Sequence, residues 1–172
     1  AFGRGPGSFT GIRIATGVAQ GLGFSVDCPL FPISSLQSLA YSAAKKGASD
    51  IWVALDARMS EVYFAKFTCN ELGIPIMLGD EIVISPASLP VDFTNTTQFV
   101  GNGWTAGYEM SAQLRSKLEG IEPFITLPSA LDSAQLAEKL MTSGIKPVSA
   151  SDAEPVYIRD NVTWDNKPKV GS

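Results

Sequence analysis

The segment from Gly3 to Gly11 reads Gly-Arg-Gly-Pro-Gly-Ser-Phe-Thr-Gly and could bind phosphate through backbone N–H groups. It lies between an expected strand end and an expected helix, and N–H groups at a helix start can bind anions. It is not a Walker A loop, because Ile12-Arg13 stands where that motif has Lys-Ser/Thr. The spacing from Gly7 to Gly11 is one residue too long for a dinucleotide fingerprint. The alternative is a tight turn followed by a helix that Ser8 caps.

Two carboxylates flank an arginine in the segment from Asp56 to Glu61, which joins two expected strands. Such a group could hold magnesium or a phosphate. Alternatively, Arg58 faces Glu61 across a Met59-Ser60 loop as a surface ion pair, which contributes only about 0–1 kcal/mol. Asp56 follows residues of a buried type, and ligands of open α/β folds gather at such strand ends.

A third candidate is the run Val100-Gly101-Asn102-Gly103-Trp104 at a strand-to-helix junction. Glycines on both sides of Asn102 would let the backbone approach a flat ligand or another element of the fold. Trp104 could stack on a base, but packing in the core is the alternative that its size favours.

The composition limits what these groups can do. Of 172 residues, 13 are Lys or Arg and 17 are Asp or Glu, so the net charge of −4 argues against an independent grip on a phosphate backbone. Charged residues are only 17%, so much of the surface must be buried in a core or against a partner. The sequence has no histidine, which removes Ser-His-Asp catalysis and imidazole zinc sites from these residues. The two cysteines, far apart, fit a cytoplasmic protein, and we predict no membrane span.

Hydrophobic periodicity predicts an α/β chain. We expect helices at 9–22, 36–46, 106–118 and 133–141, with Ser8, Ser34 or Ser35, and Asp132 as caps, and a short helix after Pro86. Strands are expected at 30–33, 51–57, 61–68, 74–84, 98–101 and 124–127. The order in 1–47 repeats the second half of the order in 49–144. We therefore expect a first unit at 1–48, a second at 49–150, and a tail at 151–172 that could return to the first unit. The first unit is expected to lack its opening strands, because the chain starts in a strand end.

The expected helix from Phe9 to Leu22 carries one narrow polar stripe. Arg13, Thr16 and Gln20 share a face, while most of the remaining circumference is apolar or glycine. Interior glycines cost about 1 kcal/mol each relative to Ala, and the close approach of another backbone would offset that cost. Either the helix is buried within its own domain, or one face lies on the sheet and another on a partner helix.

Three motifs resemble those of the TsaB (YeaZ) family. The first is the glycine-rich run from Gly3 to Arg13 with its continuation Gln20-Gly21-Leu22, the second runs from Asp56 to Tyr63, and the third from Ala153 to Arg159. They occur in the family's order over nearly the whole chain, which is similar to the gammaproteobacterial form. Family members begin earlier, so we expect an N-terminally truncated chain.

The resemblance implies an actin-like fold (the ASKHA, or sugar-kinase/Hsp70, type) of two ribonuclease-H-like subdomains, of which the first is incomplete here. It also implies a non-catalytic scaffold subunit that pairs with the catalytic subunit TsaD and the ATPase TsaE. That complex transfers a threonylcarbamoyl group to N6 of a tRNA adenosine, so tRNA is contacted only through the complex. We expect no catalytic residue, metal or cofactor in this chain.

On the family's template the first helix docks the partner, and the same helix forms a homodimer when the partner is absent. The residues expected at this interface are Phe9, Ile12, Arg13, Ala15, Thr16, Ala19 and Gln20. A degenerate nucleotide site is expected at Asp56, Arg58, Glu61, Gly101, Asn102 and Gly103, crowded by the side chains of the Asp56 loop. The alternative is an enzyme in its own right, an actin-like ATPase or a peptidase.

Overall fold

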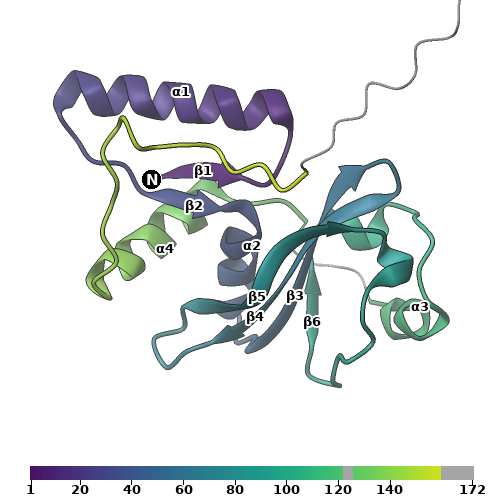
Figure 1. The fold of residues 1–172 in the computed structure, drawn as a ribbon. Helices are drawn as coiled ribbons and strands as arrows, with labels where there is room; N and C mark the ends of the chain where they lie inside the picture. The colour runs from purple at the N-terminus through teal and green to yellow at the C-terminus, as the bar shows by residue number, and fades with distance from the viewer. Residues whose placement is uncertain (122–125, 160–172) are drawn as a thin grey trace, which may run out of the picture.

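Two β-sheets organise the part of the chain that the computed structural model describes, residues 1–121 and 126–159 (Figure 1). The elements are, in order, β1 (Phe2–Gly5), α1 (Phe9–Val26), β2 (Pro32–Ser34), α2 (Ser35–Ala44), β3 (Asp50–Arg58), β4 (Glu61–Cys69), β5 (Pro75–Ile84), the 3₁₀ helix η1 (Pro86–Ser88), β6 (Gln98–Val100), the 3₁₀ helix η2 (Asn102–Thr105), α3 (Ala112–Leu118) and α4 (Ala130–Thr142).

The larger sheet has the strand order β5-β4-β3-β6. Strands β3, β4 and β5 form an antiparallel meander, and β6 joins β3 in parallel. The smaller sheet is the parallel pair β1-β2, whose crossover connection is α1. In Figure 1, α1 lies on one side of this pair and α4 on the other.

Strand β3 is buried on both faces, which explains its nearly continuous apolar sequence. Ile51, Val53 and Leu55 pack with α2 in one core cluster. Trp52 points to the opposite face, because alternate residues of a strand do, and meets Phe64 edge to face at a centroid distance of 5.3 Å. Trp104 belongs to that second cluster, so its core packing is confirmed and no stacking role is left for its ring.

Two helices pack across the boundary predicted at residue 48, and the division into two units stays a prediction. Helix α2, from the expected first unit, covers the larger sheet through Leu36, Leu39 and Ala43. Helix α4, from the expected second unit, packs on β2 through Leu136 and Leu140, in a cluster that includes Ile33. Both helices thus pack across this boundary, because their buried apolar residues contact elements of the other expected unit.

Most predicted elements are confirmed within a few residues, with three differences. Helix α3 begins at Ala112 rather than at 106, because 102–105 form η2 and Gly107 has a left-handed φ of 75°. Ser129, not Asp132, caps α4, its hydroxyl accepting from the backbone N–H of Asp132. The strand expected at 124–127 falls partly outside the described residues. In the described ranges no helix has both the length and the apolar character to cross a membrane.

Asp132 instead joins α4 to α2 through side-chain hydrogen bonds. It is buried and accepts hydrogen bonds from Ser42 and Lys45. Burial raises the pKa of the Asp132 carboxyl, but hydrogen bonds from Lys45 and Ser42 and the charges of Lys45 and Lys46 outweigh burial, so the pKa lies below its ordinary value. The ionised carboxylate therefore stabilises the contact between the two helices.

We predict that Asp132→Asn lowers the free energy of unfolding by about 1–3 kcal/mol at pH 7, because a charge-assisted hydrogen-bond network is lost. A carboxyl whose pKa is lower in the folded protein stabilises above its unfolded pKa and loses that contribution as pH falls through the folded value. The difference between wild type and variant should therefore shrink below about pH 4. Urea unfolding at pH 7 and pH 3 measures it, with the exposed Asp80→Asn as control. A difference that is equal at both pH values would contradict the assignment.

Candidate docking surface and nucleotide site

The polar stripe of α1 faces the chain's own C-terminal segment. Thr16 is buried, and the Gln20 side-chain amide donates to the backbone oxygen of Ala153 at 2.9 Å. Arg13 donates from Nε to the Tyr157 hydroxyl at 2.7 Å. Thr16 and Gln20 therefore lie on the inner side of the helix, and the exposed Arg13 lies at the edge of that side.

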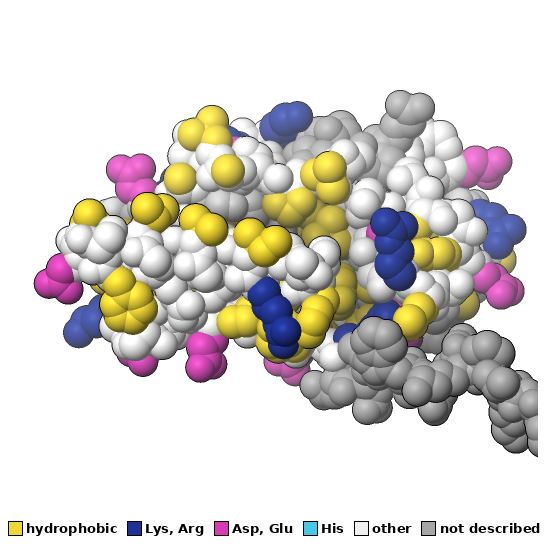
Figure 2. All heavy atoms as spheres, turned by 90° about the horizontal axis from the view of Figure 1, so that it is seen from above, with side chains coloured by type: hydrophobic (Ala, Val, Ile, Leu, Met, Phe, Trp, Pro, Cys, Tyr) yellow, Lys and Arg dark blue, Asp and Glu magenta, His cyan; other side chains and the backbone are white. Residues whose placement is uncertain are grey.

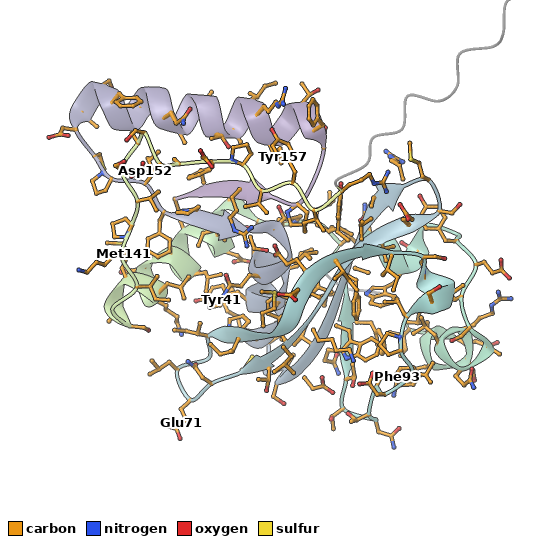
Figure 3. All side chains as sticks on the ribbon, viewed as in Figure 1. Tyr41, Glu71, Phe93, Met141, Asp152 and Tyr157 are labelled. Atoms are coloured by element: carbon orange, nitrogen blue, oxygen red, sulfur yellow. The ribbon has the colours of Figure 1, made fainter. Side chains whose placement is uncertain are left out.

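Residues 153–159, called the strap below, run between α1 and β1 (Figure 1). The backbone N–H of Val156 donates to the carbonyl oxygen of Arg4 at 2.8 Å, which fixes the strap to β1. Figure 3 shows Tyr157 near the end of α1 at which the helix begins, and its ring lies 5.6 Å from that of Phe9, centroid to centroid. The third sequence motif thus forms a layer between the helix and the sheet.

The opposite side of α1 is apolar and uncovered. Ile14, Val18 and Leu22, spaced four residues apart, are 61%, 58% and 64% exposed. Figure 2, seen from the side of α1, shows hydrophobic side chains in a row over this helix with backbone between them. Exposed large apolar side chains that line up on one face are typical of an interaction surface. We call Ile14, Gly17, Val18, Gly21 and Leu22 the outer face of α1.

The glycines of α1 divide into two kinds. A Cβ on Gly23 would lie 3.0 Å from Ala150 Cβ and from the Cys28 carbonyl oxygen, so this glycine is required by packing inside the chain. A Cβ on Gly17 or Gly21 would meet no heavy atom within 4 Å, apart from the adjacent residues and the helix's own backbone. Nothing in the described part of the chain therefore requires these two glycines, although each lowers helix stability.

The predicted interface residues are distributed around the helix. Phe9 and Arg13 are exposed, Ala15, Ala19 and Gln20 are half-buried, and Ile12 and Thr16 are buried against the chain itself. The last two therefore lie on the inner side, away from the outer face. The predicted set does not include the exposed Ile14, Val18 and Leu22, although their shared i, i+4 spacing is visible in the sequence.

The hairpin between β3 and β4 differs from the predicted ion pair. Arg58 and Glu61 are opposite each other in the ladder, but the Arg58 guanidinium pairs with Asp56 at 3.0 Å. Glu61 pairs with Arg159 of the strap at 2.6 Å, and Arg159 also donates to the Ala57 carbonyl at 3.1 Å. The predicted pairing was wrong, because a residue 98 positions away provides the cation for Glu61.

Asp56 is held by its own surroundings. Its Oδ1 accepts from the Tyr108 hydroxyl at 2.7 Å and from the Arg58 N–H at 2.8 Å, while its N–H donates to the Asn102 side-chain oxygen at 3.0 Å. Burial raises the pKa of Asp56. The hydrogen bonds from Tyr108 and the Arg58 backbone, with the Arg58 charge, lower it by a larger amount, so the pKa lies below its ordinary value. The carboxylate is ionised and already has partners, which leaves little of it for a ligand.

Gly101 and Gly103 serve close packing inside the chain. A Cβ on Gly101 would lie 2.0 Å from the Ala54 carbonyl oxygen, and Gly101 has a φ of 103°. A Cβ on Gly103 would lie 2.8 Å from the Ala54 carbonyl carbon and 2.9 Å from Ala54 Cβ. Of the two roles that the sequence left open, the structure supports approach to another element, strand β3.

Three of the six predicted nucleotide-site residues, Asp56, Arg58 and Asn102, line one cleft. A cleft of about 480 Å³ lies between the glycine-rich turn and the hairpin, lined by Gly7, Ser8, Phe9, Asp56, Ala57, Arg58, Met59, Tyr63, Asn102 and Arg159. Glu61, Gly101 and Gly103 are not among the lining residues. The hairpin tip has left-handed φ values of 55–62° at Arg58, Met59 and Ser60, and none of the three is a glycine. Their side chains therefore occupy the place where a phosphate would have to come close to the backbone. No group of three or more acidic or cysteine ligands is placed to hold a metal in 1–121 and 126–159.

Comparisons with known proteins assign the family. A family model described as TsaD, tRNA N6-adenosine threonylcarbamoyltransferase, matches residues 1–167. The tRNA threonylcarbamoyladenosine biosynthesis protein TsaB of Escherichia coli K12 is 38% identical over 172 residues, which cover 98% of this chain and 73% of that protein. The chain belongs to the TsaB (YeaZ) family. The family member of the same name from Haemophilus influenzae is 37% identical over 98% of this chain and 72% of its own length.

Solved structures of the TsaB (YeaZ) family share the fold. YeaZ from Pseudomonas aeruginosa superposes with a TM-score of 0.75 at 35% identity, over 90% of this chain and 71% of that chain. A second Pseudomonas aeruginosa structure, of a protein described as similar to peptidase YEAZ, gives 0.77 at 35% identity, over 91% and 71%. The predicted family is thus confirmed, with a mixed α/β fold of the actin-like, TsaD-related type.

We predict that Gly103→Ala destabilises the protein by about 1–3 kcal/mol, because the added methyl overlaps the Ala54 backbone and overpacking costs this much. Gly3→Ala is the matched control, since no heavy atom lies within 4 Å of its Cβ position and its φ is not left-handed. Chemical denaturation of both variants measures the difference. If Gly103→Ala unfolds at the same denaturant concentration as Gly3→Ala, close packing does not explain this glycine.

Proposed function

We propose that this chain is a non-catalytic scaffold subunit in the biosynthesis of tRNA threonylcarbamoyladenosine. The names of its relatives in Escherichia coli and Haemophilus influenzae support the pathway. The partner that we propose is the TsaD-type catalytic subunit, which works with the ATPase TsaE, and tRNA is reached only through this assembly.

The outer face of α1 carries the proposal. Gly17 and Gly21 lie in the middle of an exposed apolar helix face, where they destabilise the helix and pack against nothing in the described chain. Small residues allow two helix axes to approach closely, and flanking apolar side chains then fill the grooves between them. Ile14, Val18 and Leu22 supply those side chains. A partner helix packed on this face accounts for both observations.

The lack of a catalytic role is supported by how the predicted nucleotide-site residues are used within the chain. Asp56, Asn102 and Glu61 each have hydrogen-bond or ion-pair partners within the chain. In the proposed nucleotide site these internal contacts occupy the polar groups that could bind a phosphate. The side chains at the hairpin tip fill the space next to the backbone that a phosphate would need. The site is therefore a degenerate one whose residues now join the strap, the hairpin and η2.

We propose that the fold consists of two related actin-like subdomains. The unit β1-α1-β2-α2 has the order of the second half of an actin-like subdomain, and β3-β4-β5, β6 and the helices that follow have the order of a fuller copy. The parallel pairing of β1 with β2 and of β6 with β3 supports this relation. On this proposal α1 is the helix of the first copy, and a homodimer through its outer face forms when the partner is absent.

Two substitutions on α1 test the docking role. Val18→Asp should abolish co-elution with the TsaD-type subunit on gel filtration, because a charge would be buried unpaired at the interface. Leu131→Asp is the control, since Leu131 is 64% exposed, close to the 58% of Val18, but lies on α4. Gly17→Ala should stabilise the isolated protein by about 1 kcal/mol and weaken the complex. Unchanged binding by Val18→Asp would overturn the docking role.

The second candidate is an enzyme in its own right, which the words "similarity to peptidase" attached to one solved relative bring forward. For an ATPase version, the 480 Å³ cleft beside Asp56 is the place where a nucleotide would bind. We expect no ATP turnover by the whole protein alone, measured as phosphate release. Turnover that is lost in Asp56→Ala, while Asp80→Ala retains it, would instead assign an ATPase.

A further inference from the structure

Arg13 is an arginine held in place without a carboxylate. Its guanidinium carbon lies 3.9 Å from the centroid of the Phe9 ring, and its Nε donates to the Tyr157 hydroxyl. In 1–121 and 126–159 neither of its terminal nitrogens has a hydrogen-bond acceptor, and no ion pair includes it. By contrast, Arg4 and Arg159 each pair with a glutamate of this chain.

This arrangement prepares the guanidinium for a ligand. An exposed arginine side chain normally loses rotamer freedom when it binds, and a ring on one side with a hydrogen bond at Nε removes much of that cost in advance. The two terminal nitrogens then present a planar fork that matches a carboxylate or a phosphate. Phe9 and Tyr157, 54% and 43% exposed, add aromatic surface of the kind found at the centres of interfaces.

The position of Arg13 ties this fork to the outer face of α1. Arg13 lies one helical turn before Gly17, and residues at i and i+4 are neighbours on a helix surface. A partner that packs closely over Gly17 therefore brings its own side chains within reach of the guanidinium. The cation stands at the edge of an apolar surface, where partial removal of water strengthens an ion pair.

We propose that the partner docked on α1 presents an aspartate or glutamate to Arg13, and that this pair fixes the position of the two helices along each other. This inference rests on the proposed docking role of α1. A protein carboxylate fits better than a nucleic-acid phosphate, because the neighbouring surface is apolar and the chain has a net charge of −4.

Binding to the TsaD-type subunit at low and high salt tests the pair. Arg13→Gln should raise the Kd about ten- to a hundredfold and reduce its salt dependence, because a charge-assisted hydrogen bond of about 1.5–3 kcal/mol is lost. Tyr157→Phe removes the same contact within the chain but keeps the guanidinium, so its effect should be clearly smaller. Arg115→Gln, on α3, is the control for loss of a positive charge elsewhere and should bind as wild type.

The outcomes separate this inference from the docking role. If Val18→Asp abolishes binding while Arg13→Gln keeps the wild-type Kd and salt dependence, α1 docks the partner but no carboxylate meets Arg13. If Val18→Asp has no effect, the docking role itself is wrong. A loss in Arg13→Gln that appears only when tRNA is present would assign the fork to phosphate and overturn the proposal. Restored binding between Arg13→Glu and a partner variant with one acidic residue changed to lysine would confirm it and identify the residue.

Discussion

The contact between the strap and the inner side of α1 determines what the helix offers to solvent. A helix that packs on a sheet usually turns its apolar side inward. Here Gln20 bonds to the strap backbone and Arg13 to Tyr157, so polar residues line the inner side together with Ile12 and Gly23. These hydrogen bonds pair Gln20 and Arg13, whereas the buried Thr16 hydroxyl has no hydrogen-bond partner among the described residues. The remaining apolar surface is left outside. The outer face thus lies opposite the side of the helix that contacts the strap.

The strap also connects the helix to the larger sheet. Its backbone bonds to β1, and Arg159 pairs with Glu61 at the β3-β4 hairpin. A second link is made by Glu81 of β5, which accepts from Arg4 at 3.1 Å and from Ser34. The acidic residues that first suggested a ligand site are therefore used to join parts of one chain. The same substitutions that would test chemistry at Asp56 or Glu61 would also alter these joints, which is why the matched controls matter.

The family motifs could be read directly in the sequence, and the Ser8 cap and nearly every strand could be predicted from it, because these depend on local spacing. It could not predict which side of α1 faces inward, since a helix with a polar stripe can pack in either orientation and the strap is more than 130 residues away. The partner of Glu61 was missed for the same reason. For Gly101 and Gly103 the sequence correctly indicated a close approach, but only the coordinates identify Ala54 as the neighbour. Local spacing was enough to predict the helices and strands, but long-range contacts determine which side of α1 is buried and which residues pair.

The separation of α1 from the strap has a consequence for biogenesis. During translation the helix leaves the ribosome early, whereas Ala153 and Tyr157, which orient it, follow 133 residues after Gln20 and 144 after Arg13. Chains fold from the N-terminus as they are made, so a nascent chain has the helix but not the segment that selects its inner side. Until residues 153–157 have been synthesised, Gln20 and Arg13 lack the contacts that orient α1 in the complete chain.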